Sequence, residues 1–434
     1  MVGNGDAGGS GSGGEPLLSC KATSYLRSLS RSDDELRVFR SCLRWMCVDQ
    51  SDTCHAVVSW SVFLLLSIFV PTASHFVLNC FPGRRAYDVA VQLSLTSASA
   101  LAFVCLSHFV RRYGLRRFLF LDKLVGESER VRAGYMDQLN RSFRLLSLFV
   151  MPCFAGEVAY KIWWYSSGSE RVPFPIAGSM AVGNVVACAL ELASWIYRVA
   201  LFLFVCVLFR LMCYLQILRL QDFAAVFVEG GPTSDVAEVL GEHLRIRRQL
   251  RIISHRYRSF ILYSLILVSA SQLVALLLTT RHRAIVNFNN AGELALCSIG
   301  LVTGLLICLR SAAKITHKAQ AITSQAATWH VCATIESDAE NRTSVPSCDD
   351  ESGEEDDECR KDDGEEILDV GKITPCHMNN ISYQKRQALV TYLENNPAGI
   401  TVFGFVVDRT WLHALFMMEF SLVMWLLGKT IGIS

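Results

Sequence analysis

The chain has 434 residues, of which 51% are hydrophobic and 19% are charged, and its formal net charge is +1. A soluble domain of this size rarely contains seven apolar stretches of close to 20 residues, so the composition excludes an ordinary soluble protein. The net charge by itself indicates no particular partner, and we expect no nucleic acid among the partners.

The first 50 residues contain no apolar core of the kind that a signal peptide needs. They begin Gly-rich and then become basic, which is typical of a disordered tail. A seven-helix transmembrane domain is expected over residues 55–428, because a helix that crosses a bilayer needs about 20 apolar residues and satisfies its own backbone hydrogen bonds. The predicted helices cover residues 55–79, 88–110, 145–166, 182–209, 260–279, 291–309 and 410–427. The predicted fold class is therefore an all-α integral membrane protein.

Lys and Arg residues are distributed unevenly between the segments that flank these helices. From the N-terminal end, the successive segments contain 6, 2, 9, 1, 8, 2 and 9 of them, and the final stub carries only Lys429. Loops rich in Lys and Arg stay in the cytosol. The alternation predicts a cytosolic N-terminus and an extracytosolic C-terminus, the reverse of a G-protein-coupled receptor.

Several helices are expected to continue beyond the membrane on the cytosolic side. Ser234 or Asp235 can cap a helix that meets no breaker except Gly241 before Thr279. A further short helix is expected over residues 383–395. After Arg310, apolar residues recur with heptad spacing at Ile315, Ala319, Ile322, Ala326, Trp329 and Ala333. Such stripes pack against other helices, either within one subunit or between subunits.

An acidic segment separates the sixth predicted helix from the seventh. Residues 336–369 contain 16 Asp or Glu against 3 Lys or Arg, with almost no large apolar residues. A segment of this composition cannot bury enough surface to fold, so we expect a disordered cytosolic insert.

Charged residues inside the predicted helices are expensive in hydrocarbon and are candidates for function. Glu157 and Lys161 are four residues apart and can form an ion pair along one helix face, either as a structural pair or as part of a site. Glu191 and Arg198 are seven residues apart on the next helix. They either line a cavity that is open to the outside or are satisfied within the bundle.

The last predicted helix follows Asp408, Arg409 and Thr410 and carries Glu419 near its middle. A single buried Glu needs a partner, for example Arg198. Around a symmetry axis, the same residue would instead form an acidic ring in a cation path. The candidate pore residues on this face are Leu412, Phe416, Glu419, Val423 and Leu426.

The architecture, and the run from Gly399 to Gly432 in particular, resembles a plant family of seven-helix proteins related to the insect gustatory and odorant receptor superfamily. Gly404 and the Asp408-Arg409-Thr410 sequence are similar to the start of the last helix in gustatory receptors. Ser421-Leu422 and Gly428-Lys429 replace the Thr-Tyr and Gln-Phe pairs of those receptors, so the roles of these pairs do not transfer. The resemblance implies a homotetramer in which the last helix lines a cation pore, with a small-molecule pocket among the outer halves of the first six helices.

Four functions compete at this point. The first is a homotetrameric, chemoreceptor-like ion channel, and the second is a transporter that uses the charged residues of the third and fourth helices. No internal repeat supports the transporter. The third is a scaffold that recruits a partner through its acidic insert. The fourth, an enzyme, is disfavoured because the sequence has no His-rich cluster, no GxSx nucleophile turn and no HExxH motif, and we expect no cofactor and no metal.

Overall fold

The computed structural model describes residues 53–79, 87–113, 129–166, 180–228, 236–280, 288–343 and 383–431. The predicted tail at residues 1–50 and most of the predicted acidic insert lie outside these ranges. The chain divides into two units, residues 1–62 and residues 63–434. The description below concerns the second unit, apart from the start of the first helix.

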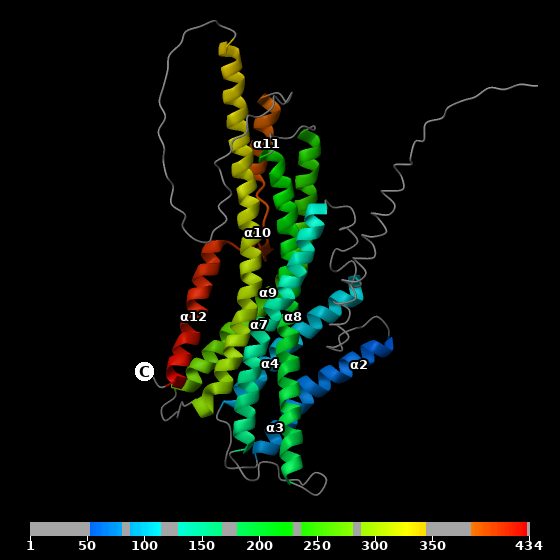
Figure 1. The fold of residues 1–434 in the computed structure, drawn as a ribbon, viewed down its shortest axis with the longest axis vertical. Coiled ribbons are helices and arrows are strands. Elements are labelled where there is room, and N and C mark those ends of the chain that lie inside the picture. The colour runs from blue at the N-terminus through cyan, green and yellow to red at the C-terminus, as the bar shows by residue number, and fades with distance from the viewer. Residues whose placement is uncertain are drawn as a thin grey trace, which may run out of the picture. The chain divides into compact units, whose positions relative to one another are not determined.

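Within the described residues, seven helices are long and apolar enough to cross a membrane, as the sequence predicts. The first crossing is built from α2 (Thr53–Leu64), the π-helical turn η1 (Leu65–Phe69) and α3 (Val70–Asn79). The others are α4 (Asp88–Tyr113), α7 (Glu129–Ser166), α8 (Met180–Val228), α9 (Val236–Thr280), α10 (Phe288–Thr343) and α12 (Arg409–Ile431). Figure 1 shows α8, α9 and α10 extending as long single helices.

The helices that continue beyond the apolar stretches begin and end close to the predicted residues. Helix α9 starts at Val236, directly after the predicted cap, and α11 covers Tyr383–Asn395. Helix α10 ends at Thr343, so it includes the first residues of the predicted acidic insert, and the remainder of the insert lies outside the described residues. Five of the six heptad positions after Arg310, from Ile315 to Trp329, are buried within this one chain. Their stripe therefore packs within its own subunit.

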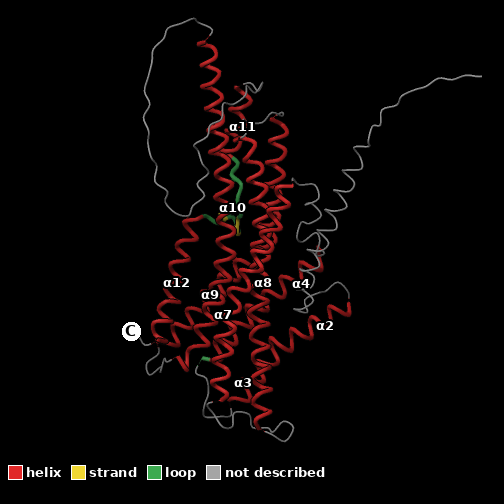
Figure 2. Tube along the Cα trace, viewed as in Figure 1, coloured by secondary structure: helices red, strands yellow, loops and turns green. Residues whose placement is uncertain are grey.

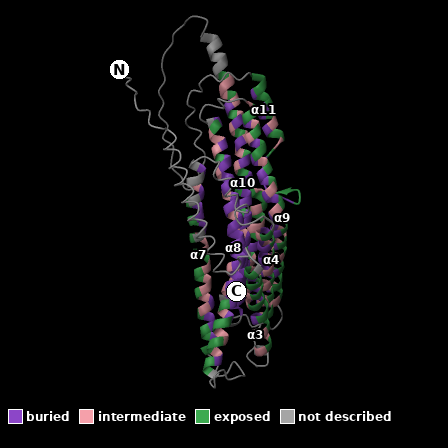
Figure 3. Cartoon of the chain, turned by 90° about the vertical axis from the view of Figure 1, so that its right-hand side faces the viewer, coloured by how far each residue is buried: buried purple, intermediate pink, exposed green. Residues whose placement is uncertain are grey.

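Helices α8 and α10 form the centre of the bundle. Of the most apolar window of each helix, 83% is buried in α8 and 72% in α10, against 17% in α7 and in α12. Figure 3 shows the buried positions concentrated along these two helices. An aromatic cluster joins α4, α8 and α9, where the Tyr257 ring lies 4.8 Å from the Phe209 ring and 5.1 Å from the Phe109 ring. Burial of such large rings contributes strongly to the stability of the bundle.

Gly304 of α10 packs directly against α8. A Cβ atom at this position would lie 2.5 Å from Cε1 of Phe202 and 3.1 Å from Cδ2 of Leu203. At Gly300, one turn earlier on the same helix, a Cβ atom would meet nothing within 4 Å. The two glycines are therefore a matched pair, one at the helix contact and one away from it.

The substitution Gly304→Ala is expected to lower the free energy of unfolding by about 1–3 kcal/mol, because an added methyl forces a packed core to shift. Gly300→Ala is expected to be neutral or stabilising, because Ala has the higher helix propensity. Thermal unfolding of the two purified variants in detergent measures the difference. Equal melting temperatures would contradict the close packing of these helices.

A short hairpin connects α11 to α12. Strands β1 (Thr401–Val402) and β2 (Phe405–Val406) pair antiparallel and are the only strands in the described part of the chain (Figure 2). Its two turn residues, Phe403 and Gly404, both have positive φ, as tight hairpin turns require. The Thr401 N–H donates to the Ser254 hydroxyl of α9 at 3.2 Å, which fixes the hairpin on the bundle.

Candidate functional site

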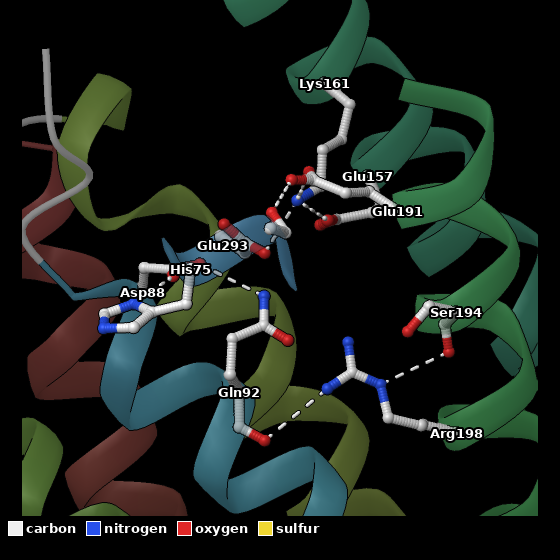
Figure 4. Close-up of polar contacts among 10 residues, drawn as sticks. His75, Asp88, Gln92, Glu157, Lys161, Glu191, Ser194, Arg198 and Glu293 are labelled. Atoms are coloured by element: carbon white, nitrogen blue, oxygen red, sulfur yellow. Dashed lines mark hydrogen bonds and ion pairs between the residues drawn. The ribbon is translucent and has the colours of Figure 1, made fainter. Parts of the chain in front are cut away.

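The buried Lys161 of α7 lies at the centre of a cluster of carboxylates (Figure 4). Its Nζ atom lies 2.8 Å from Glu191 Oε2 on α8 and 3.0 Å from Glu293 Oε1 on α10. Glu157, one turn earlier on α7, lies 3.5 Å away. The relative exposure of these four side chains does not exceed 6%. One ammonium group thus holds three helices together through three carboxylates, and we call these four residues the Lys161 cluster.

A second cation, Arg198, lies on α8 two turns after Glu191 and is also buried. Its guanidinium group donates to the Thr96 hydroxyl at 3.2 Å and to the Gln92 carbonyl at 3.5 Å, both on α4. It also donates to the Ser194 carbonyl on its own helix at 3.3 Å. Arg198 therefore joins α8 to α4, as the Lys161 cluster joins α8 to α7 and α10.

The polar network extends to α3. The Ser74 hydroxyl donates to Glu191. His75 Nδ1 lies 3.5 Å from Asp88 Oδ2, and the Gln92 side-chain amide donates to the other oxygen of Asp88 at 3.1 Å. Figure 4 shows His75, Asp88 and Gln92 on one side of the same polar region, with Arg198 and Ser194 on the other. Five helices thus contribute polar side chains to one buried region.

Carboxyl groups outnumber the permanent cations among the described residues of this region. Lys161 and Arg198 supply two positive charges and a protonated His75 would supply a third, whereas the three glutamates of the Lys161 cluster together with Asp88 supply four carboxyl groups. Burial of charge is stabilising only with close opposite charges and hydrogen bonds, so the removal of one cation here has a large cost. The arrangement is suited to holding a cationic or hydrogen-bonding group.

All four charged residues that the sequence singled out in the third and fourth helices lie in this region. Glu157 and Lys161 pair with each other, as their spacing predicts. Glu191 and Arg198 share a helix face, but each has its own partners on other helices. Glu293 was missed. The available signal was an acidic residue within the apolar stretch 291–309 that had no basic residue nearby in sequence.

Glu419, near the middle of α12, is fully buried against its own chain. Its Oε1 atom accepts a hydrogen bond from the Ser269 hydroxyl of α9 at 2.6 Å. The alternative partner, Arg198, is engaged with α4 instead. Val423 and Leu426 are buried with Glu419, whereas Leu412 and Phe416 are half-buried. The predicted pore face is therefore the face that α12 turns toward its own bundle.

The opposite face of α12 is exposed. Ala414, Met417, Ser421 and Met424 recur at helical spacing about half a turn away from Glu419, and all four are exposed. Asp408 stands before the first turn of this helix, where its carboxylate accepts from the Arg409 N–H at 2.6 Å and its carbonyl accepts from the Leu412 N–H at 3.1 Å. Asp408 therefore stands at the N-cap position, and Arg409 and Thr410 begin the first turn of α12.

The sequence model of a family described as "Protein of unknown function (DUF3537)" matches residues 34–418. The chain belongs to the DUF3537 family. The matched range includes every residue of the Lys161 cluster and ends one residue before Glu419. A search of curated proteins finds no match.

Solved structures of the insect olfactory receptor OR5 from Machilis hrabei share the fold of this DUF3537 protein. One aligns over 91% of this chain and 99% of OR5, with a TM-score of 0.53 and 13% sequence identity. The structure of OR5 in complex with eugenol aligns over 87% and 90% of the two chains, with a TM-score of 0.51 and 12% identity. The DUF3537 protein is therefore a multi-pass integral membrane protein with a chemoreceptor-like seven-helix fold.

Proposed function

We propose that this DUF3537 protein is a homotetrameric, chemoreceptor-like ion channel that conducts cations and opens in response to a small molecule. The proposal rests on the position and the low burial of α12. In a fold shared with an olfactory receptor, this apolar helix lies at the edge of the bundle with only 17% of its most apolar window buried. A peripheral helix with a large exposed face is suited to pack around a symmetry axis.

The proposed path is lined by α12. We place the exposed face of Ala414, Met417, Ser421 and Met424 toward the axis in the conformation described here. The face that the sequence singled out, with Glu419 at its centre, would reach the path only after α12 rotates. The hydrogen bond from Ser269 holds Glu419 away from the axis in this conformation.

The Lys161 cluster and Arg198 lie in the part of the bundle that the first six helices form, and we propose this region as the ligand site.

The proposed orientation of the protein in the membrane rests on the distribution of Lys and Arg, which predicts a cytosolic N-terminus. Accessibility of a tag placed after Ser434 tests it directly, and a tag reached only from the cytosol would contradict it.

Subunit counting is the experiment that tests the channel. We expect single-particle images of the detergent-purified protein to show a four-fold particle with α12 next to the axis, and bilayers containing it to carry cation currents. A monomer, or a dimer without a central axis, would contradict the proposed pore. The membrane in which the protein resides does not affect this test.

A transporter is the second candidate, and the Lys161 cluster favours it. Buried ion pairs that link several helices are typical of substrate and proton pathways in transporters. Uptake into liposomes that saturates with substrate, without single-channel steps, would support the transporter over the channel. A scaffold instead predicts that deletion of the acidic insert, residues 336–369, abolishes partner recruitment while assembly persists.

A further inference from the structure

Four cations from three helices lie at one level of the bundle, where the apolar stretches predicted from the sequence end. Arg210 follows the apolar stretch of α8, and Arg310 and Lys314 follow that of α10. Arg141 precedes the apolar stretch of α7. Three of the four side chains are exposed and Arg210 is half-buried. We call these four residues the basic cluster.

The contacts between α8 and α10 place Arg210 beside Arg310. The two helices run parallel: Gly304 meets Phe202, and Cys308 lies 4.0 Å from the Cys206 carbonyl. One turn beyond Arg310, the Lys314 ammonium donates to the Tyr214 hydroxyl at 3.4 Å. Arg210 and Arg310 lie between these last two contacts, so they occupy the same level.

Helix α7 runs antiparallel to α8 and brings Arg141 to the same level. At one end of the contact, a Cβ atom on Gly134 would lie 3.1 Å from Leu218, and at the other end Lys161 pairs with Glu191. This register places Arg141 opposite Arg210.

Few acidic residues in the described parts of α7, α8 and α10 lie near enough to neutralise the cluster. Helix α8 carries no Asp or Glu from residue 192 to 221, and α10 carries none from residue 294 to 335. On α7, Asp137 is one turn away from Arg141, with no ion pair between them. The buried Nε of Arg210 has no hydrogen-bond partner among the described residues. The aromatic ring of Tyr214 lies between two of the cations, 5.9 Å from Arg210 Cζ and 5.2 Å from Lys314 Nζ.

We propose that the basic cluster binds the phosphate-bearing headgroup of an anionic phospholipid. Arginine forks match phosphate oxygens, and basic groups between helices at the inner membrane surface are typical sites for such headgroups. The position at the ends of three apolar stretches puts the cluster at the level of lipid headgroups rather than in open solvent. The distribution of Lys and Arg predicts that this is the cytosolic side, where anionic lipids are concentrated.

Native mass spectrometry of the full-length protein released from nanodiscs tests the proposal. The nanodiscs contain phosphatidylcholine, either alone or with added phosphatidylinositol bisphosphate. We expect the protein to retain the anionic lipid in preference to phosphatidylcholine. Each neutralised cation near a membrane surface is expected to weaken retention by about fivefold, so the combined change of Arg141, Arg210 and Arg310 to Gln weakens it by roughly 100-fold.

Arg251→Gln, at an exposed position of α9, is the matched control and is expected to leave retention unchanged. If the triple variant does not fold, the single variant Arg310→Gln, which changes an exposed side chain, is still expected to weaken retention of the anionic lipid about fivefold. Equal retention of both lipids by the natural protein, or an equal loss in Arg251→Gln, would overturn the proposal. Binding of inorganic phosphate in phosphatidylcholine nanodiscs, without a preference for the anionic lipid, would identify free phosphate as the ligand and overturn the lipid assignment.

Discussion

Replacement of Lys161 by Met is expected to lower the free energy of unfolding by at least about 3–5 kcal/mol, which is the usual cost of removing one partner from a buried ion pair. Here one substitution leaves Glu157, Glu191 and Glu293 buried around an uncharged side chain. Because folded proteins have only a limited net stability, we expect little folded protein to be recovered. Yield after size-exclusion chromatography and melting temperature in detergent measure the effect.

A compensating variant separates the loss of charge from the loss of packing. If electrostatics dominate, Lys161→Met combined with Gln at Glu191 and Glu293 recovers much of the stability, because fewer carboxyl groups remain without a cation. Lys385→Met, at an exposed position of α11, is the matched control and is expected to change stability by less than about 0.5 kcal/mol. No recovery in the combined variant would assign the effect to packing and contradict the electrostatic account of the Lys161 cluster.

Substitution of Ser421 by Lys is expected to reduce cation current at least about tenfold while leaving the tetramer intact. If α12 lines a four-fold axis through its exposed face, one substitution places four ammonium groups around the path, and rings of positive charge repel cations. Because Ser421 is exposed in the single chain, the change creates no clash within the subunit. Currents from reconstituted bilayers, together with the size of the purified particle, measure both parts of the prediction.

Cysteine accessibility provides the control for this second prediction. Ser421→Cys is expected to react with a charged thiol reagent that blocks the current, whereas Val423→Cys, on the buried face, is expected to be protected. The reverse pattern would place the Glu419 face on the path and contradict the orientation of α12 proposed here. Unchanged currents in Ser421→Lys would argue against α12 as the pore helix.

The helices could be predicted from the sequence because their signals are local. Long apolar stretches define the crossings, and Ser234 and Asp235, after a Gly-Gly-Pro turn, predict the start of α9. The hairpin at residues 401–406 was not predicted, although Gly404 between apolar residues is a recognisable turn signal. Strands of two residues are too short to show the alternation that identifies a strand.

The candidate site was only partly predictable. Glu157 and Lys161 are neighbours on one helix, so their pairing follows from sequence spacing. Glu293 joins them from 132 residues away, a contact that depends on how α10 packs against α7. The orientation of Glu419 could not be predicted from the sequence either. Helix α12 is apolar on every side, so its sequence does not specify which face turns toward α9.

Helix α10 connects the Lys161 cluster directly to the far end of the bundle. It continues without a proline from Phe288 to Thr343, so Glu293 and Trp329 are joined by a single rod of roughly 54 Å. Beyond the apolar stretch, the same helix contacts α8 through Trp329 and Phe227 and contacts α11 through His330 and Tyr383. A rotation of the whole α10 helix after release of Glu293 from Lys161 would therefore displace α8 and α11 at that far end as well.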